Sequence, residues 1–208
     1  IADNVGDNVG DVAGMGADLF DSNVAAMASA LVMAQALDGG IGVNSAVVFC
    51  YAAIGLLASI IGIACARVGK NGNPTQALNS STYSTTLLFI ILTGAATWFL
   101  DGFEWRIWGA SAIGLVVGVV IGITTDYFTD DSKPIVRKVA HASQSGSAFT
   151  ILSGISYGFI SALPAMVGIA VSALAAYKLC EPLGEGYALF GIAMAAVGML
   201  SIVGMIIS

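Results

Sequence analysis

The 208-residue chain is too apolar and too weakly charged for a soluble globular protein. Hydrophobic residues make up 57% and charged residues 10% of it, with a mean hydropathy of +0.90, whereas soluble domains carry about 25% charged residues. The net charge of −6 and the lack of a basic cluster argue against nucleic acid as a partner. We therefore expect an all-α, multi-pass membrane protein whose surroundings are the lipid bilayer.

The first 21 residues carry five of the thirteen carboxylates, at Asp3, Asp7, Asp11, Asp18 and Asp21. On one uninterrupted α-helix, at about 100° per residue, all five fall within about 80° of each other. Like charges at this spacing destabilise a helix, and a carboxylate in hydrocarbon is costly, so the stripe needs cations and is a functional candidate. Asp3, Asp7 and Asp11 recur at every fourth residue, which favours hard divalent cations with oxygen ligands, most simply Mg²⁺ bridging to phosphate.

Asp18 and Asp21 lie deeper, where the chain has turned apolar, and carboxylates at that depth are functional candidates by default. The residues alone support two functions equally, an enzyme acting on a metal-bound phosphate compound and a passive divalent-cation channel or carrier with an aspartate-lined pore. A scaffold without catalytic function is a third alternative, and it predicts that Asp3 to Asp18 could be replaced with little loss.

Hydropathy predicts six membrane spans, each with roughly the 20 apolar residues that a bilayer requires. The spans are residues 12–37, 45–66, 84–100, 107–128, 149–177 and 187–208. Polar turns join them, and the segment 129–143 is predicted to be a polar loop. Together they form a single transmembrane domain over residues 1–208. Because the chain opens on Ile and closes on an apolar run, we expect it to be an internal piece of a longer protein.

Lysine and arginine divide unevenly between the two sides that six alternating spans define. Arg67, Lys70, Lys133, Arg137 and Lys138 fall on one side, and Arg106 and Lys178 on the other. Since positive charge is enriched in cytoplasmic loops, the first side is predicted to be cytoplasmic. The same alternation places the outer three aspartates of the stripe in the cytoplasm.

The string DNVGDNVGDVAGMGADLF, from Asp3 to Phe20, resembles the signature of the membrane-integral pyrophosphatases, ion pumps driven by pyrophosphate hydrolysis. Weaker similarity continues at residues 77–79, 127–129 and 198–201. The resemblance implies a bundle of about sixteen helices, of which this chain would hold the sixth to the eleventh. It also implies Mg²⁺-dependent hydrolysis of inorganic pyrophosphate coupled to transport of H⁺ or Na⁺, with K⁺ or Na⁺ as an activator, in a homodimer. The expected location is a prokaryotic inner membrane with the catalytic side facing the cytoplasm.

The resemblance also implies residue roles. Asp3 and Asp7 are similar to ligands of the magnesium ions that hold pyrophosphate, Asp11 to an aspartate that positions the attacking water, and Asp18 to the carboxylate of the ion gate. Many sodium-pumping relatives carry a gate glutamate where Asp21 stands, whereas plant-type proton pumps carry it where this chain has Ala25, so the transported ion stays open.

Two further expectations follow from the resemblance. The segment 144–150, QSGSAFT, departs from the run usual in the family, and its role is not predicted. The remaining metal and phosphate ligands of the family lie on other helices. The 208 residues are therefore expected to be inactive on their own.

Overall fold

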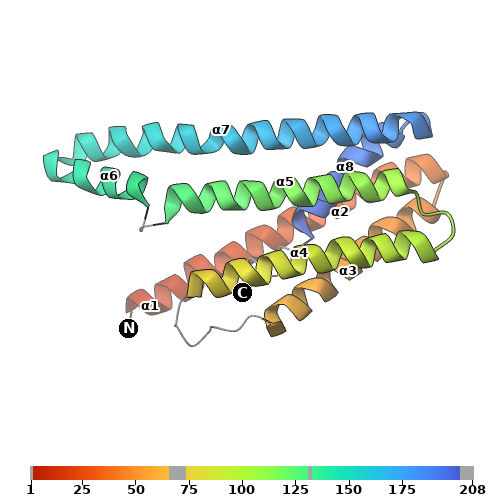
Figure 1. Ribbon diagram of the computed structural model, residues 1–208, viewed down its shortest axis with the longest axis horizontal. Helices are drawn as coiled ribbons and strands as arrows, with labels where there is room; N and C mark the ends of the chain where they lie inside the picture. Colours follow the sequence, from red (N-terminus) through yellow and green to blue (C-terminus); the bar gives the residue numbers. More distant parts are fainter. Residues whose placement is uncertain (1, 66–73, 131–132, 202–208) are drawn as a thin grey trace.

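The computed structural model describes residues 2–65, 74–130 and 133–201, without the side chains of Asp11, Cys65 and residues 74–79. All regular structure in these ranges is helical, which confirms the all-α prediction (Figure 1). The elements are α1 Ala2–Asp7, η1 Asn8–Gly14, α2 Met15–Asp38, α3 Val43–Cys65, α4 Pro74–Phe99, α5 Trp105–Thr129, α6 Pro134–Ala142, η2 Ser143–Ser145, α7 Ser147–Cys180, η3 Glu181–Leu183 and α8 Tyr187–Leu200.

Each predicted span overlaps one of the longer helices over its described residues, in the order α2, α3, α4, α5, α7 and α8. Four of them contain segments long and apolar enough to cross a membrane, namely α3, α4, α5 and α7. The chain is therefore a helical membrane bundle. Six spans remain a prediction, because α2 is not among these four, α8 is described over only 14 residues and residues 202–208 lie outside the described part.

The prediction of a polar loop over residues 129–143 is wrong, because most of this segment is the helix α6. Pro134 occupies its first turn, where a missing N–H costs nothing. Ile135 and Val139 are half-buried and α6 packs against α7, while Arg137 and Lys138 are exposed. The charged residues of α6 lower its mean hydropathy, so a search for apolar membrane spans does not detect this amphipathic helix.

Helices α5 and α8 cross at backbone contact, and glycine makes this crossing possible. A Cβ on Gly114 would collide with the carbonyl group of Ala195, and a Cβ on Gly198 with that of Ser111. Small residues at such crossings let membrane helices approach closely. Helix α5 also packs along α7, its antiparallel neighbour in Figure 1, so that α5 is the central helix of this half of the bundle.

A second packing centre surrounds the C-terminal half of α2. Ala30 and Ala34 of α2 are fully buried together with Tyr51 of α3 and Phe190 and Met194 of α8. These contacts hold the C-terminal half of α2 against α3 and α8. They define which face of α2 is turned toward the rest of the chain.

The described ends of the helices lie at two opposite ends of the bundle, and six alternating spans stay a prediction. The N-terminus and α6 lie at one end of the bundle, and the α4–α5 and α7–α8 connections lie at the other (Figure 1). Arg106 Nη1 donates to the carbonyl oxygen of Leu179 at 3.5 Å, so Arg106 and Lys178 share an end. Lys133, Arg137 and Lys138 lie at the opposite end with the acidic helix, whereas Arg67 and Lys70 fall outside the described residues.

The α5–α8 crossing predicts a sharp difference between two glycines of α5. Gly114→Ala should destabilise the full-length protein by roughly 1–3 kcal/mol, because the added methyl group has no room. Gly122→Ala is the matched control, since nothing lies within 4 Å of its Cβ position. Thermal unfolding in detergent measures both variants. Equal melting temperatures for the two would contradict the close crossing.

Candidate functional site

The acidic stripe lies on one continuous helical rod made of α1, η1 and α2. Asp3 and Asp7 belong to α1 and Asp11 to η1, while Asp18 and Asp21 lie in the first two turns of α2. The side chains of Asp3, Asp7, Asp18 and Asp21 are exposed. The side chain of Asp11 lies outside the described part of the structure.

The middle of the rod, Asn8–Gly14, is a π-helix, so the assumption of one uninterrupted α-helix is wrong. Glycine is a poor helix former, and Gly10 and Gly14 fall inside this segment. The side-chain amide of Asn8 donates to the Asn4 carbonyl at 2.8 Å, at the junction where the α pattern stops. The sequence signal for this segment is the repeated glycine at Gly6, Gly10 and Gly14.

The π segment changes how the carboxylates are arranged around the rod. Its i→i+5 hydrogen bonds place about one extra residue in the turn, which rotates everything beyond it by roughly 100° relative to an α-helix. Asp18 then stays within about 80° of Asp7, and Asp21 moves to roughly 140° from it. The four carboxylates whose side chains are described therefore form a broad acidic surface rather than a single narrow line.

Helix α2 has two distinct faces. Its buried residues are Ala30 and Ala34. Counting back along the helix from Ala30, Asp21 lies about 180° and Asp18 about 120° around the axis. The carboxylates are thus turned away from α3 and α8, and they project where the described chain supplies no other helix.

The described carboxylates of the stripe have no counter-charge. The ion pairs of the described residues are Lys133–Asp130 at 3.5 Å and Lys178–Glu181 at 3.0 Å, and neither involves α1 or α2. Apart from the rod itself, α1 and η1 pack substantially against no other described element. Four unneutralised carboxylates on one rod suit metal ions or cationic side chains from further helices.

The structure does not gather a complete metal site within the described residues. No group of three or more acidic, histidine or cysteine side chains in this part could hold a metal ion together. Asp3 and Asp7 are one α-helical turn apart and both are exposed, so they fit as two ligands of an ion completed by other groups. The predicted set of Asp3, Asp7 and Asp11 stays a prediction, since the Asp11 side chain is not described.

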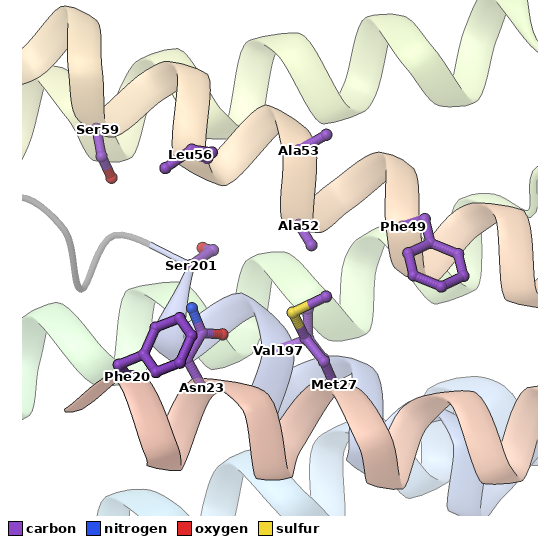
Figure 2. Close-up of a pocket in the computed structure, with 10 residues that line it drawn as sticks. All are labelled: Phe20, Asn23, Met27, Phe49, Ala52, Ala53, Leu56, Ser59, Val197 and Ser201. Carbon is purple, nitrogen blue, oxygen red and sulfur yellow. The ribbon is translucent and has the colours of Figure 1, made fainter. Parts of the chain in front are cut away.

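A cavity of about 450 Å³ opens between α2, α3 and α8, on a different side of α2 from its carboxylates (Figure 2). Figure 2 shows Asn23, Ser59 and Ser201 at one end of it, whereas Phe49 and Met27 line the other end. No charged side chain lines it. An apolar, uncharged cavity does not suit a metal, a phosphate group or a transported cation, and the acidic surface of α2 is the better candidate.

The divergent segment 144–150 spans the turn between α6 and α7. Ser143–Ser145 forms a 3₁₀ turn, and Gly146 has a φ of 118°, where a side chain would be strained. Its residues are mostly exposed, at the same end of the bundle as α1. The turn therefore reverses the chain, and we assign it no chemical role.

A helical membrane bundle with a carboxylate-bearing helix turned outward is the class of protein that these observations define. The family model described as "Inorganic H+ pyrophosphatase" matches residues 1–208. The chain therefore belongs to the inorganic H⁺ pyrophosphatase family.

Individual relatives agree with this assignment. The chain is 40% identical over 214 residues to a Clostridium tetani protein provisionally named a K⁺-stimulated pyrophosphate-energized sodium pump, covering 100% of the chain and 31% of the relative. It is 40% identical over 207 residues to a K⁺-insensitive pyrophosphate-energized proton pump 2 of Moorella thermoacetica, covering 97% and 30%. A K⁺-insensitive proton pump of Methanosarcina mazei is 38% identical over 211 residues, covering 100% and 31%. The chain spans about 30% of the length of these relatives.

Proposed function

We propose that the full-length protein containing this chain hydrolyses inorganic pyrophosphate and uses the released free energy to move H⁺ or Na⁺ across a membrane. The observation that carries this proposal is the family match over residues 1–208, with relatives named as pyrophosphate-energized pumps. The outward acidic face of α2 supports it. These comparisons favour a pump over the passive cation channel that the residues alone left open.

The hydrolytic end of the rod would be α1 and η1. Asp3 and Asp7 would hold Mg²⁺ bound to pyrophosphate, and Asp11 would orient and deprotonate the attacking water. Bound Mg²⁺ would neutralise charge on the leaving phosphate. Further helices must contribute the other ligands, because the described residues contain no complete metal cluster. The 208 residues alone are therefore proposed to be inactive.

The translocation step would use the carboxylates of α2. Asp18 follows Asp11 by seven residues, or about 10.5 Å along an α-helix and somewhat less through the π segment. A small shift of the rod could therefore change the surroundings of both groups at once. Asp21, rotated away from Asp7, would contribute to the gate from the flank of this surface.

The ion and the activator differ among the relatives. The names given to relatives include both a K⁺-stimulated sodium pump and K⁺-insensitive proton pumps, at the same 40% identity for the first two. We propose Mg²⁺ as the cofactor, with K⁺ or Na⁺ as an activator. We further propose a homodimer in a prokaryotic inner membrane, with α1 and α6 on the cytoplasmic side because α6 carries the basic residues.

Replacing Asp11 tests the hydrolytic assignment. Asp11→Asn keeps the size of the side chain and removes the base, so phosphate release by the full-length protein should fall by about 10²- to 10⁴-fold. Asp126→Asn, an exposed carboxylate of α5, is the control and should leave the rate unchanged. Phosphate release with saturating Mg²⁺ is the measurement. An Asp11→Asn protein with the parental rate would refute the role of Asp11.

Replacing Asp18 tests the translocation assignment. Asp18→Asn cannot bind or release a proton at this position, so ion uptake into vesicles should fall at least about tenfold, while phosphate release falls less. Uptake of ²²Na⁺ and internal acidification, measured in parallel, identify the ion. Undiminished uptake of both ions by Asp18→Asn would remove Asp18 from the pathway.

A further inference from the structure

The buried side chain of Asn44, in α3, forms hydrogen bonds with residues at the end of α2 and at the start of α8. Its backbone N–H donates to Asp38 Oδ2 at 3.0 Å. Its side-chain Nδ2 donates to Asp38 Oδ1 at 2.6 Å and to the Tyr187 hydroxyl oxygen at 3.3 Å. Asp38 ends α2, Asn44 lies in the first turn of α3 and Tyr187 begins α8. We call these three residues the Asp38 anchor.

The surrounding glycines show that this junction is tightly built. A Cβ on Gly42 would lie 2.5 Å from Asp38 Oδ2, so only glycine leaves room for the carboxylate. Gly39 ends α2 with a φ of 69°, and Gly186 has a φ of 87°, both in the left-handed region that favours glycine. A Cβ on Gly186 would approach Leu37 Cδ2 to 2.9 Å. The end of α2 is therefore enclosed by the starts of α3 and α8.

The opposite end of the rod is different. Helix α1 buries no residue, and the buried residues of α2 are Ala30 and Ala34, both in the half near the anchor. Asn44 is only 6% exposed, whereas Asp18 and Asp21 are exposed. Within the described chain, the buried residues of α2 thus lie in the half near Asp38, whereas its described carboxylates are exposed.

We propose that Asp38, Asn44 and Tyr187 are positioning residues that hold one end of α2 in place while its acidic end moves during turnover. This inference rests on the proposed function. If α2 is fixed at Asp38, a displacement of α1 during hydrolysis tilts α2 and moves Asp18 relative to the rest of the bundle. If α2 is not fixed there, the same displacement shifts the whole helix, Asp18 moves less relative to α1, and fewer ions are transported per pyrophosphate. The π segment provides a joint between the two parts of the rod.

Three substitutions test the anchor in the full-length protein, purified and reconstituted into vesicles. Asn44→Leu removes both side-chain hydrogen bonds at similar size, and Tyr187→Phe removes a single hydroxyl group. Tyr51→Phe is the matched control, because it also removes a hydroxyl that bridges two helices, to Thr97 Oγ1 at 2.8 Å, but between α3 and α4. The readout is the number of ions taken up per pyrophosphate hydrolysed.

Asn44→Leu should lower the ratio of ions to pyrophosphate at least about twofold with hydrolysis retained, because both side-chain hydrogen bonds of Asn44 are lost. Tyr187→Phe should lower it less, and Tyr51→Phe should leave it unchanged even where it lowers thermal stability. An unchanged ratio in Tyr187→Phe and in any Asn44→Leu protein that folds would overturn the anchor, and so would an equal fall in Tyr51→Phe. Failure of the parental protein to hydrolyse pyrophosphate would instead refute the proposed function.

Discussion

The structure depends on keeping the carboxylates of α2 away from lipid while the helix still packs in a membrane bundle. A charge in hydrocarbon is costly, so such a helix must turn its charged face toward water, cations or other polar groups. Helix α2 meets this constraint by dividing its faces, with Ala30 and Ala34 buried against the bundle and Asp18 and Asp21 on the far side. In the proposed function, hydrolysis and transport would both use carboxylates of the rod that α2 continues.

The rest of the chain holds α2 in that orientation. The close crossing of α5 and α8, which Gly114 and Gly198 permit, places α8 where it can pack on α2. The small side chains of Ala30 and Ala34 let α2 pack closely against α3 and α8, and in the proposed role the Asp38 anchor fixes the end of α2. The buried residues of α2 thus lie in its C-terminal half, and its carboxylates Asp18 and Asp21 lie in the other half.

The sequence predicted the helices well because long apolar runs leave few alternatives in a membrane. The sequence-based prediction was wrong for two segments whose backbone conformation depends on local interactions. Residues 134–142 were predicted as a loop because their charges mask an amphipathic helix, and the π segment at 8–14 was missed because a constant 100° per residue cannot reveal it. The second failure matters most, since it changes the position of Asp21 relative to Asp7.

The sequence predicts which residues form the candidate site, but not how they are arranged around the rod. The motif from Asp3 to Phe20 identified the carboxylates, because their spacing and their place before an apolar run are local features. The anchor was not predictable, because Asn44 and Tyr187 are 143 residues apart and only folding brings them together. The described residues contain no complete set of metal ligands, so no pattern within them could supply the geometry of the proposed metal site.

The most direct measurement of the two faces of α2 is the reactivity of single cysteines in the full-length protein. Cys50, Cys65 and Cys180 are first replaced by alanine, and a small water-soluble methanethiosulfonate reagent is applied. We expect Asp18→Cys to react rapidly, while Ala30→Cys on the buried face and Phe159→Cys on an apolar face of α7 stay unreactive. Rapid reaction at Ala30→Cys with protection at Asp18→Cys would contradict the orientation of α2.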